Sequence, residues 1–233
     1  MFFDMTYLYL VLPAIVFSLW ASARVKSTFK KYSQQYSSSH ITGAQAAQRV
    51  LYANGLTDVR IERITGSLTD HYDPKENVIR LSSPVFDSTS TAAIGVAAHE
   101  AGHALQYAQG YAPIKLRAAI VPATNIGSKL AIPLVIIGLV MSYMSQTYIS
   151  IAYAGILLFA ICVFFQLVTL PVEFNASHRA LLAIEGQGML SDEELEGSRK
   201  VLSAAAMTYV AALAVSLAQL LRFLMLVSGS RRN

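Results

Sequence analysis

The sequence contains little charge and almost no cysteine. Charged residues make up 14% of the 233 residues and hydrophobic residues 54%, proportions that lie outside those of ordinary soluble domains. Cys162 is the single cysteine, so the chain cannot form an internal disulfide and a disulfide-stapled scaffold is excluded. The net charge is only +4, and the basic residues cluster beside apolar runs. This pattern argues against a nucleic-acid surface and indicates a lipid bilayer as a partner.

Charge is absent altogether from Leu130 to Leu170. A membrane crossing needs about 20 apolar residues, so this run is long enough for two crossings. The polar and aromatic stretch from Ser142 to Ser150 is the natural place for the turn between them. We therefore predict a transmembrane hairpin over residues 130–170.

Basic residues are also missing from the N-terminal side of the first apolar run, Phe2 to Ala23, where Asp4 stands instead. A secretory signal peptide carries its positive charges before the run. Here they follow it, although Ala21-Ser22-Ala23 resembles a signal-peptidase site. We predict that residues 1–23 form a retained transmembrane anchor. The positive-inside rule then places the following residues in the cytoplasm. We therefore expect a multi-pass protein of the cell (inner or plasma) membrane whose active site faces the cytoplasm.

A further uncharged run extends from Val201 to Leu221. We predict that residues 201–227 form a C-terminal helix that is either transmembrane or packed against the membrane part. A span here would leave Arg231 and Arg232 on the outer side, against the positive-inside trend. A buried or interfacial helix that closes the site is therefore the alternative.

Residues 24–129 have the pattern of a small α+β domain. Thr42 to Ala53 has apolar residues at helical spacing, and Val59 to Ile64 alternates apolar and charged residues as a half-buried strand does. A hairpin is expected from Leu68–Tyr72 and Val78–Ser82, which flank a segment with turn residues. Together with about four transmembrane helices, this predicts a mainly α chain that contains an α+β domain.

The strongest motif is His99-Glu100-Ala101-Gly102-His103. Hydroxyl residues from Ser88 to Thr91 offer an N-cap and Gly110 offers a stop, which predicts a helix over about 91–109. Two histidines four residues apart project from one face of a helix and can fill two corners of a tetrahedral zinc ion. Glu100 would then act as general base toward a zinc-activated water molecule. This is the H-E-x-x-H spacing of metalloproteases.

A catalytic zinc ion needs a third protein ligand and one open position. The segment 171–200 follows the predicted membrane hairpin and returns to the side of the motif helix. Glu173, expected at the start of a new helix, is the first choice for this ligand. His178 is the alternative, and Glu185 lies further along the chain.

The chain resembles the YugP-type membrane zinc metallopeptidases of bacteria. The resemblance runs from Tyr32 to Leu221 and is carried by Val96 to Gln106, by His71-Tyr72-Asp73-Pro74 and by Pro171-Val172-Glu173-Phe174. More distantly, the order of helix, membrane hairpin and glutamate resembles the HtpX and CAAX-prenyl-protease organisation. The resemblance implies a zincin-like (gluzincin) fold and a Zn²⁺ cofactor.

In those gluzincins the downstream glutamate is the third zinc ligand, which the resemblance carries onto Glu173. The sequence departs from the expected pattern at three nearby positions. Asn175 and His178 stand where Asp and Arg are expected, and Ser177 stands where the distant relatives carry Asp. These departures concern the groups around the ligands and leave the ligands themselves in place.

The predicted function is hydrolysis of peptide bonds in membrane or membrane-proximal proteins, with Glu100 as the base. An additional donor should stabilise the oxyanion, and Tyr72, His71 and Tyr209 are the candidates. The main alternative is a zinc-stabilised scaffold or assembly factor without catalysis. A transporter is disfavoured because the predicted spans contain hardly any ionisable residue. A homo-oligomer or a membrane partner protein is compatible with the sequence.

Overall fold

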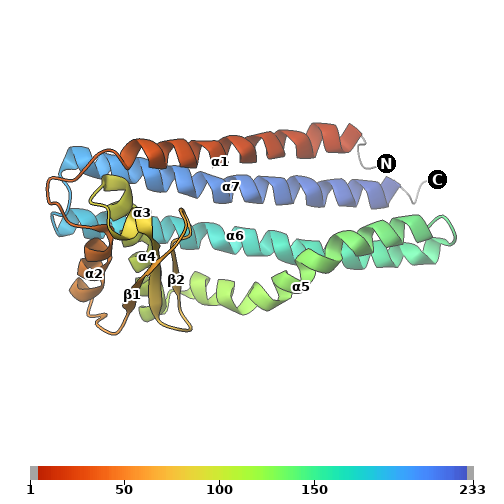
Figure 1. Cartoon of the computed structure of the whole chain (residues 1–233). Helices are drawn as coiled ribbons and strands as arrows, with labels where there is room; N and C mark the ends of the chain where they lie inside the picture. The colour runs from red at the N-terminus through yellow and green to blue at the C-terminus, as the bar shows by residue number, and fades with distance from the viewer. Residues whose placement is uncertain (1–4, 230–233) are drawn as a thin grey trace. The chain divides into compact units, whose positions relative to one another are not determined.

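The computed structural model describes residues 5–229, and most of them are helical (Figure 1). The expectations that concern Phe2, Asp4, Arg231 and Arg232 lie outside the described residues. In chain order the helices are η1 (Tyr7–Val11), α1 (Leu12–Tyr32), α2 (Gly43–Ala53), α3 (Ser83–Phe86), α4 (Thr91–Ala108), α5 (Ala112–Met141), η2 (Gln146–Tyr148), α6 (Ile149–Gly186) and α7 (Asp192–Gly229). Three strands, β1 (Arg60–Ile64), β2 (His71–Asp73) and β3 (Val78–Ser82), lie between α2 and α3.

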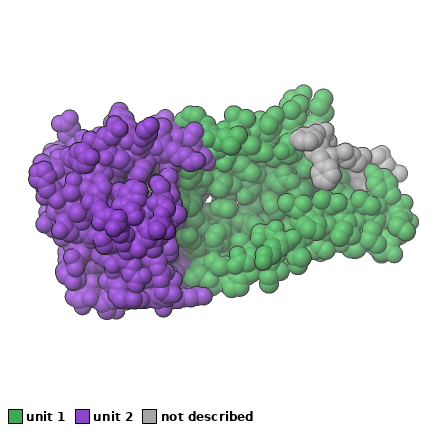
Figure 2. Space-filling model, in the orientation of Figure 1, with its two compact units in different colours: residues 1–20, 116–170, 208–233 green, residues 21–115, 171–207 purple. Residues whose placement is uncertain are grey.

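The chain divides into two compact units, which Figure 2 shows in different colours. Unit 1 comprises Met1–Trp20, Leu116–Leu170 and Thr208–Asn233. Unit 2 comprises Ala21–Lys115 and Pro171–Met207. Segments from both sides of the uncharged run therefore belong to unit 2.

The small sheet of unit 2 has the strand order β1-β3-β2. β2 pairs with β3 in antiparallel fashion, with Tyr72 opposite Ile79, which confirms the predicted hairpin. β1 forms where the alternating pattern predicts a strand, and it pairs with β3 in parallel. The central strand is the most buried one, because Val78, Ile79 and Leu81 are fully covered.

Helices α2 and α4 pack closely in unit 2. Thr42 caps α2, and its hydroxyl accepts from the Gln45 backbone N–H while the Gln45 side chain accepts from the Thr42 backbone N–H. This capping box satisfies two N–H groups that the helix leaves without intrahelical partners. Gly43 allows the close approach, since a Cβ there would lie 3.1 Å from the Ala93 carbonyl oxygen of α4 and 2.2 Å from the Val85 carbonyl oxygen of α3. The largest buried apolar side chains of this core are Leu51, Ile79, Leu81, Ile94, Ile184 and Met189.

Small residues bring α5 and α6 together in unit 1. A Cβ at Gly138 would lie 2.2 Å from the Ala152 nitrogen, and one at Gly155 would lie 2.7 Å from the Ala131 carbonyl oxygen. Close backbone contact through small residues is the usual way that transmembrane helices pack. The chain turns between the two helices at residues 142–148, within the predicted turn.

Four helical segments are long and apolar enough to cross a membrane: Tyr7–Tyr32, Ala112–Met141, Gln146–Gly186 and Asp192–Gly229. Many of their large apolar side chains are exposed, among them Val16, Trp20, Val140 and Leu157. Exposed apolar surface of this extent is expected where lipid rather than water is the solvent. The number of candidate spans among the described residues agrees with the prediction of about four.

One sequence-based helix boundary is wrong, and two helices extend beyond the predicted spans. Glu173 does not begin a new helix, because α6 continues through Pro171 to Gly186. The basic segment before Leu130 and the apolar residues after it form one helix, α5, with Pro122 and Pro133 inside it. The helix that contains residues 201–227 starts at Asp192, where Ser191 to Glu194 have the pattern of a capped helix start. Proline removes one hydrogen bond without ending a helix whose neighbours support it.

Candidate metal centre

The two motif histidines lie on α4, which begins and ends as the sequence predicts. Ser90 caps the helix, and its hydroxyl accepts from the Ala93 backbone N–H at 3.2 Å. Gly110 follows the helix with φ +68°, a conformation that favours glycine at a helix end. His99 and His103 are one turn apart, and their ring centroids are 4.7 Å apart with the planes at 81°.

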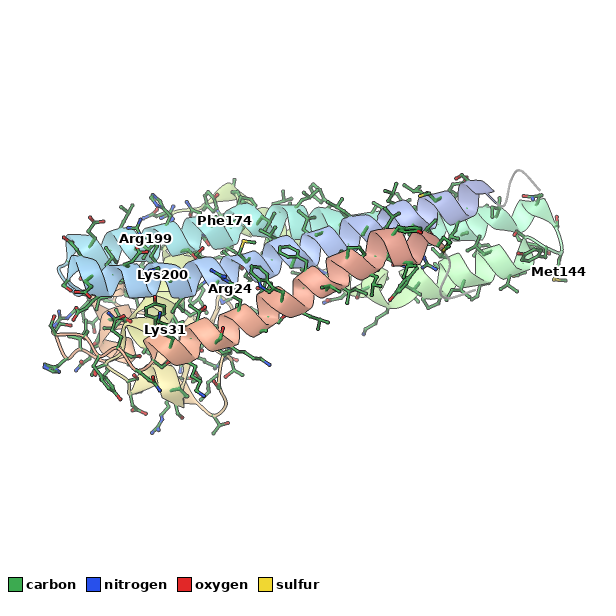
Figure 3. The ribbon with its side chains drawn as sticks, turned by 90° about the horizontal axis from the view of Figure 1, so that it is seen from above. Arg24, Lys31, Met144, Phe174, Arg199 and Lys200 are labelled. Carbon is green, nitrogen blue, oxygen red and sulfur yellow. The ribbon has the colours of Figure 1, made fainter. Side chains whose placement is uncertain are left out.

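Glu173 on α6 completes the cluster. Its Oε2 lies 3.4 Å from His99 Nε2 and 3.6 Å from His103 Nε2. The side chains of His99, His103 and Glu173 are only 14%, 12% and 3% exposed. The next residue, Phe174, lies on the outer surface of α6 and is 49% exposed (Figure 3). Glu173 and Phe174 therefore lie on different faces of the helix, the first buried and the second exposed.

Gly102 explains why α6 comes so near to α4. A Cβ at this position would lie 2.7 Å from the Ala176 carbonyl oxygen and 3.3 Å from the Ala176 Cα. A larger residue would therefore push the two helices apart. The small residue at this position of the motif therefore allows the close approach of the two helices.

The arrangement of the three donors fits a zinc ion. Tetrahedral ligands at about 2.0–2.1 Å from zinc lie about 3.3–3.4 Å from one another. The observed 3.4 and 3.6 Å between the imidazole nitrogens and the carboxylate oxygen are close to this spacing, and the three donor atoms lie within 4.8 Å of one another. Two histidines and one glutamate form a donor set that leaves a fourth position open, as catalytic zinc sites do.

Both imidazoles are held through their second nitrogen. His99 Nδ1 lies 3.1 Å from Ser177 Oγ, and His103 Nδ1 lies 3.0 Å from Gln106 Oε1. These contacts direct both Nε2 atoms toward Glu173. Histidines that bind a metal usually have such a partner, which fixes the ring and its tautomer.

The charge around His103 favours its protonated form when no metal is present. Burial by itself lowers the pKa of His103, but Glu173, Glu100 and Gln106 outweigh this effect and raise the pKa above its usual value. A divalent cation would take the place of that proton, since metal ligands must be deprotonated. The site is therefore electrostatically suited to a cation.

Glu100 and His178 lie outside the cluster of three donors. Glu100 is 7% exposed on α4, directly after His99. His178 is exposed on α6. Among the described residues, the group with the spacing of a metal site comprises His99, His103 and Glu173.

The three oxyanion candidates have different surroundings. The Tyr72 hydroxyl donates to Asn77 Oδ1 at 2.9 Å, and its ring lies 5.7 Å from that of Tyr107. Burial raises the pKa of Tyr72, so its hydroxyl remains a donor at neutral pH. His71 is exposed, with Nδ1 2.9 Å from the Thr69 carbonyl oxygen. Tyr209 belongs to unit 1.

Gln106 and Arg179 have contacts near the site that a local sequence pattern does not predict. Gln106 is fully buried, and its Nε2 donates to the Val172 carbonyl oxygen at 2.8 Å and to Asn175 Oδ1 at 3.0 Å. Arg179 Nε donates to the same Asn175 oxygen at 2.6 Å. The signal that could have identified Gln106 is its position three residues after His103, because that spacing places two side chains on the same helix face.

Comparison with known proteins points to one family. The family model described as "Putative neutral zinc metallopeptidase" matches residues 7–228. A relative from Bacillus subtilis (strain 168), described as "Putative membrane protease YugP", is 48% identical over 227 residues, which cover 97% of this chain and 99% of the relative. No solved structure matches the chain.

Proposed function

Because this chain belongs to the YugP-type family of neutral zinc metallopeptidases, we propose that it is a membrane endopeptidase that uses zinc to hydrolyse peptide bonds. The observation that carries the proposal is the convergence of His99, His103 and Glu173 on one buried point. Family and relative together support a zinc peptidase in a membrane, and the four apolar helices fit a multi-pass protein. The identity of the base, the substrates and the orientation are parts of the proposal.

The roles of the residues follow from their chemistry and position. His99, His103 and Glu173 would hold the zinc ion, which when bound lowers the pKa of water and polarises the scissile carbonyl group. Glu100 is adjacent to His99 and buried, where a carboxylate can accept a proton from water and return it to the leaving amine. Of the three oxyanion candidates, Tyr72 and His71 belong to the same unit as the proposed ligands, and the Tyr72 hydroxyl would have to leave Asn77 Oδ1 in order to donate to an oxyanion.

The fold class and the substrate class belong to the same proposal. A small sheet beside a ligand-bearing helix, with a glutamate from a later helix, is the arrangement that a zincin-like domain requires. All three proposed ligands lie in unit 2, whereas the uncharged run belongs to unit 1. We therefore expect cleavage of membrane or membrane-proximal proteins outside the hydrocarbon region.

The test is the substitution Glu100→Gln in the full chain. It removes the base and leaves all three proposed ligands, so the variant is expected to keep one zinc ion per chain and to lose hydrolysis by at least about 100-fold. The measurements are zinc content by elemental analysis and cleavage of fluorescein-labelled casein. The matched control is Glu185→Gln, an exposed carboxylate on α6, which is expected to behave as wild type.

The possible outcomes are distinct. Undiminished cleavage by the Glu100→Gln variant would refute the assigned base. A wild-type protein that retains zinc against chelators but cleaves no protein substrate would favour the zinc-stabilised scaffold. A wild-type protein without zinc would overturn the whole proposal.

A further inference from the structure

We propose that Gln106, Asn175 and Arg179 form a relay of hydrogen bonds that fixes the tautomer of His103 and so prepares its Nε2 to bind the metal. This inference rests on the proposed function, since it assigns positioning residues to the same site. The three residues connect the end of α4 to the part of α6 that carries Glu173. Gln106 lies on α4 three residues after His103, but the proposed chemistry gives it no role.

The direction of each hydrogen bond follows from the one group that can only donate. A guanidinium has no acceptor, so Asn175 must present its Oδ1 to Arg179 Nε, which lies 2.6 Å away. The same oxygen lies 3.0 Å from Gln106 Nε2. Gln106 must therefore donate to it.

A second constraint gives the same answer independently. Gln106 Nε2 also lies 2.8 Å from the Val172 backbone carbonyl oxygen, which can only accept. Both hydrogens of the Gln106 amide are thus used, and its Oε1 is the atom that faces His103 Nδ1 at 3.0 Å. An amide oxygen can only accept, so Nδ1 must carry the proton. The lone pair of neutral His103 is then on Nε2, the atom that faces Glu173.

Burial makes this arrangement costly to change. Gln106 is fully buried, and a buried amide that loses a partner suffers the full desolvation cost of the donor or acceptor left unsatisfied. Rotation of its amide group would place an NH₂ group against His103 Nδ1–H and an oxygen against the Val172 carbonyl. Arg179 is itself held in place by a hydrogen bond to Gln109 Oε1 and by the ring of Tyr111, 5.8 Å away.

The other imidazole has no such constraint. His99 Nδ1 contacts the Ser177 hydroxyl, which can donate or accept. The contact therefore permits either tautomer of His99. Within the pair, the contacts of the described residues therefore fix the tautomer of His103 and leave that of His99 open.

The experiment compares zinc affinity among full-length variants by competition with a chelator. Gln106→Met keeps the size of the side chain and removes both hydrogen-bonding ends, and it is expected to weaken zinc binding about 10–100-fold. Asn175→Leu removes the acceptor that orients Gln106 and leaves the Val172 carbonyl, so a smaller loss is expected. Asn175→Asp keeps an acceptor for both Gln106 and Arg179 and is expected to retain the affinity that Asn175→Leu loses.

A spectroscopic readout separates positioning from general packing. In zinc-loaded protein with ¹⁵N-labelled histidine, the Nδ1–H of His103 is expected to exchange slowly with water because it is donated to a buried amide. This signal should disappear in Gln106→Met. The control is Gln48→Met, an exposed glutamine on α2, which should change neither the affinity nor the signal.

The outcomes distinguish this inference from the proposed function. Wild-type affinity and a retained N–H signal in Gln106→Met would overturn the relay. Equal losses in Asn175→Asp and Asn175→Leu would also overturn it, and this pair decides the question if Gln106→Met fails to fold. If wild-type protein binds zinc and Glu100→Gln lacks activity while Gln106→Met is unaffected, the proposed function stands and only the relay fails. If wild-type protein binds no zinc, both are wrong.

Discussion

Glu173 determines whether the two motif histidines form a metal site or a buried pair of imidazoles. It is separated from them by about 70 residues of sequence, yet its Oε2 lies within 3.4 and 3.6 Å of both Nε2 atoms. A carboxylate so well covered needs a cation or strong donors to offset its desolvation. The cluster therefore depends on all three residues together.

This dependence gives a prediction for the third ligand. Glu173→Gln is expected to reduce zinc affinity by more than about 100-fold, because loss of an outer hydrogen bond to a ligand already costs 10–100-fold. His178→Gln is expected to bind zinc as wild type does, since His178 is exposed. Both affinities are measured by chelator competition. The reverse result would make His178 the ligand and remove Glu173 from the site.

The sequence allows prediction of the side chains in the cluster, but not of the residues that hydrogen-bond to them and hold them in place. The spacing of His99 and His103 predicts two of the three clustered side chains, and the place of Glu173 after the uncharged run predicts the third. Gln106 was missed because a glutamine near a helix end is ordinarily a solvated residue. Its role depends on contacts with Val172 and Asn175, more than 60 positions later in the chain, and a local pattern contains no such information.

At the level of the elements, the contact between α4 and α6 sets the geometry of the site. Gly102→Ala would place a Cβ 2.7 Å from the Ala176 carbonyl oxygen. Overpacking of this kind costs about 1–3 kcal/mol, which outweighs the gain of up to about 1 kcal/mol in helix propensity. We expect a lower midpoint of thermal unfolding and weaker zinc binding.

The matched control is Gly186→Ala at the end of α6, where a Cβ would meet nothing within 4 Å. This variant is expected to unfold at the same temperature as wild type or slightly above it. Unfolding is followed by circular dichroism of the full chain in detergent, with zinc content measured in parallel. Equal behaviour of the two variants would show that the helices do not need close contact at Gly102.

The helix boundaries show why element ends are harder to predict than elements. The helix Thr42–Ala53, the strand near Val59–Ile64 and the hairpin were predicted from periodicity and turn residues, and the structure confirms them. The break expected at Pro171 was wrong. A change from apolar to charged residues marks a change of surroundings, whereas a helix ends only where its backbone hydrogen bonds find another partner.

For the whole molecule, composition predicts the membrane and the distribution of basic residues predicts its orientation. Basic side chains lie on α1 and α7 within unit 2, among them Arg24, Lys31, Arg199 and Lys200 (Figure 3). Positive charge beside a span favours the cytoplasmic side. The proposed orientation therefore places unit 2, and with it the metal centre, in the cytoplasm.

This orientation can be tested with single cysteines in a Cys162→Ala background. Met144→Cys lies in the turn between α5 and α6, where Met144 is 81% exposed, and Gln34→Cys lies in the exposed segment after α1. A membrane-impermeant maleimide is expected to label Met144→Cys in intact cells and Gln34→Cys only after permeabilisation. The opposite labelling pattern would place the metal centre outside the cell.

The number of candidate spans followed from length and hydropathy, but the way in which segments combine into units did not. Residues 21–115 and 171–207 form one unit although a long uncharged run separates them. Packing between distant segments depends on details such as Gly95, where a Cβ would lie 3.0 Å from the Ser198 Cβ. Such pairings are visible only once the chain has folded.

The contact between Gly102 and Ala176 also bears on which ions the centre can accept. Long side chains between two helices can change rotamer and so alter the distance between the helices. At Gly102 the neighbouring atoms belong to the backbone of α6, so the distance between the two ligand-bearing helices cannot change in this way. Ca²⁺ needs six to eight oxygen ligands at about 2.3–2.6 Å, and two imidazoles and one carboxylate at this fixed spacing cannot supply them. In the proposed centre, the exclusion of Ca²⁺ would thus follow from the set of three donors and from the close approach of α4 and α6 at Gly102.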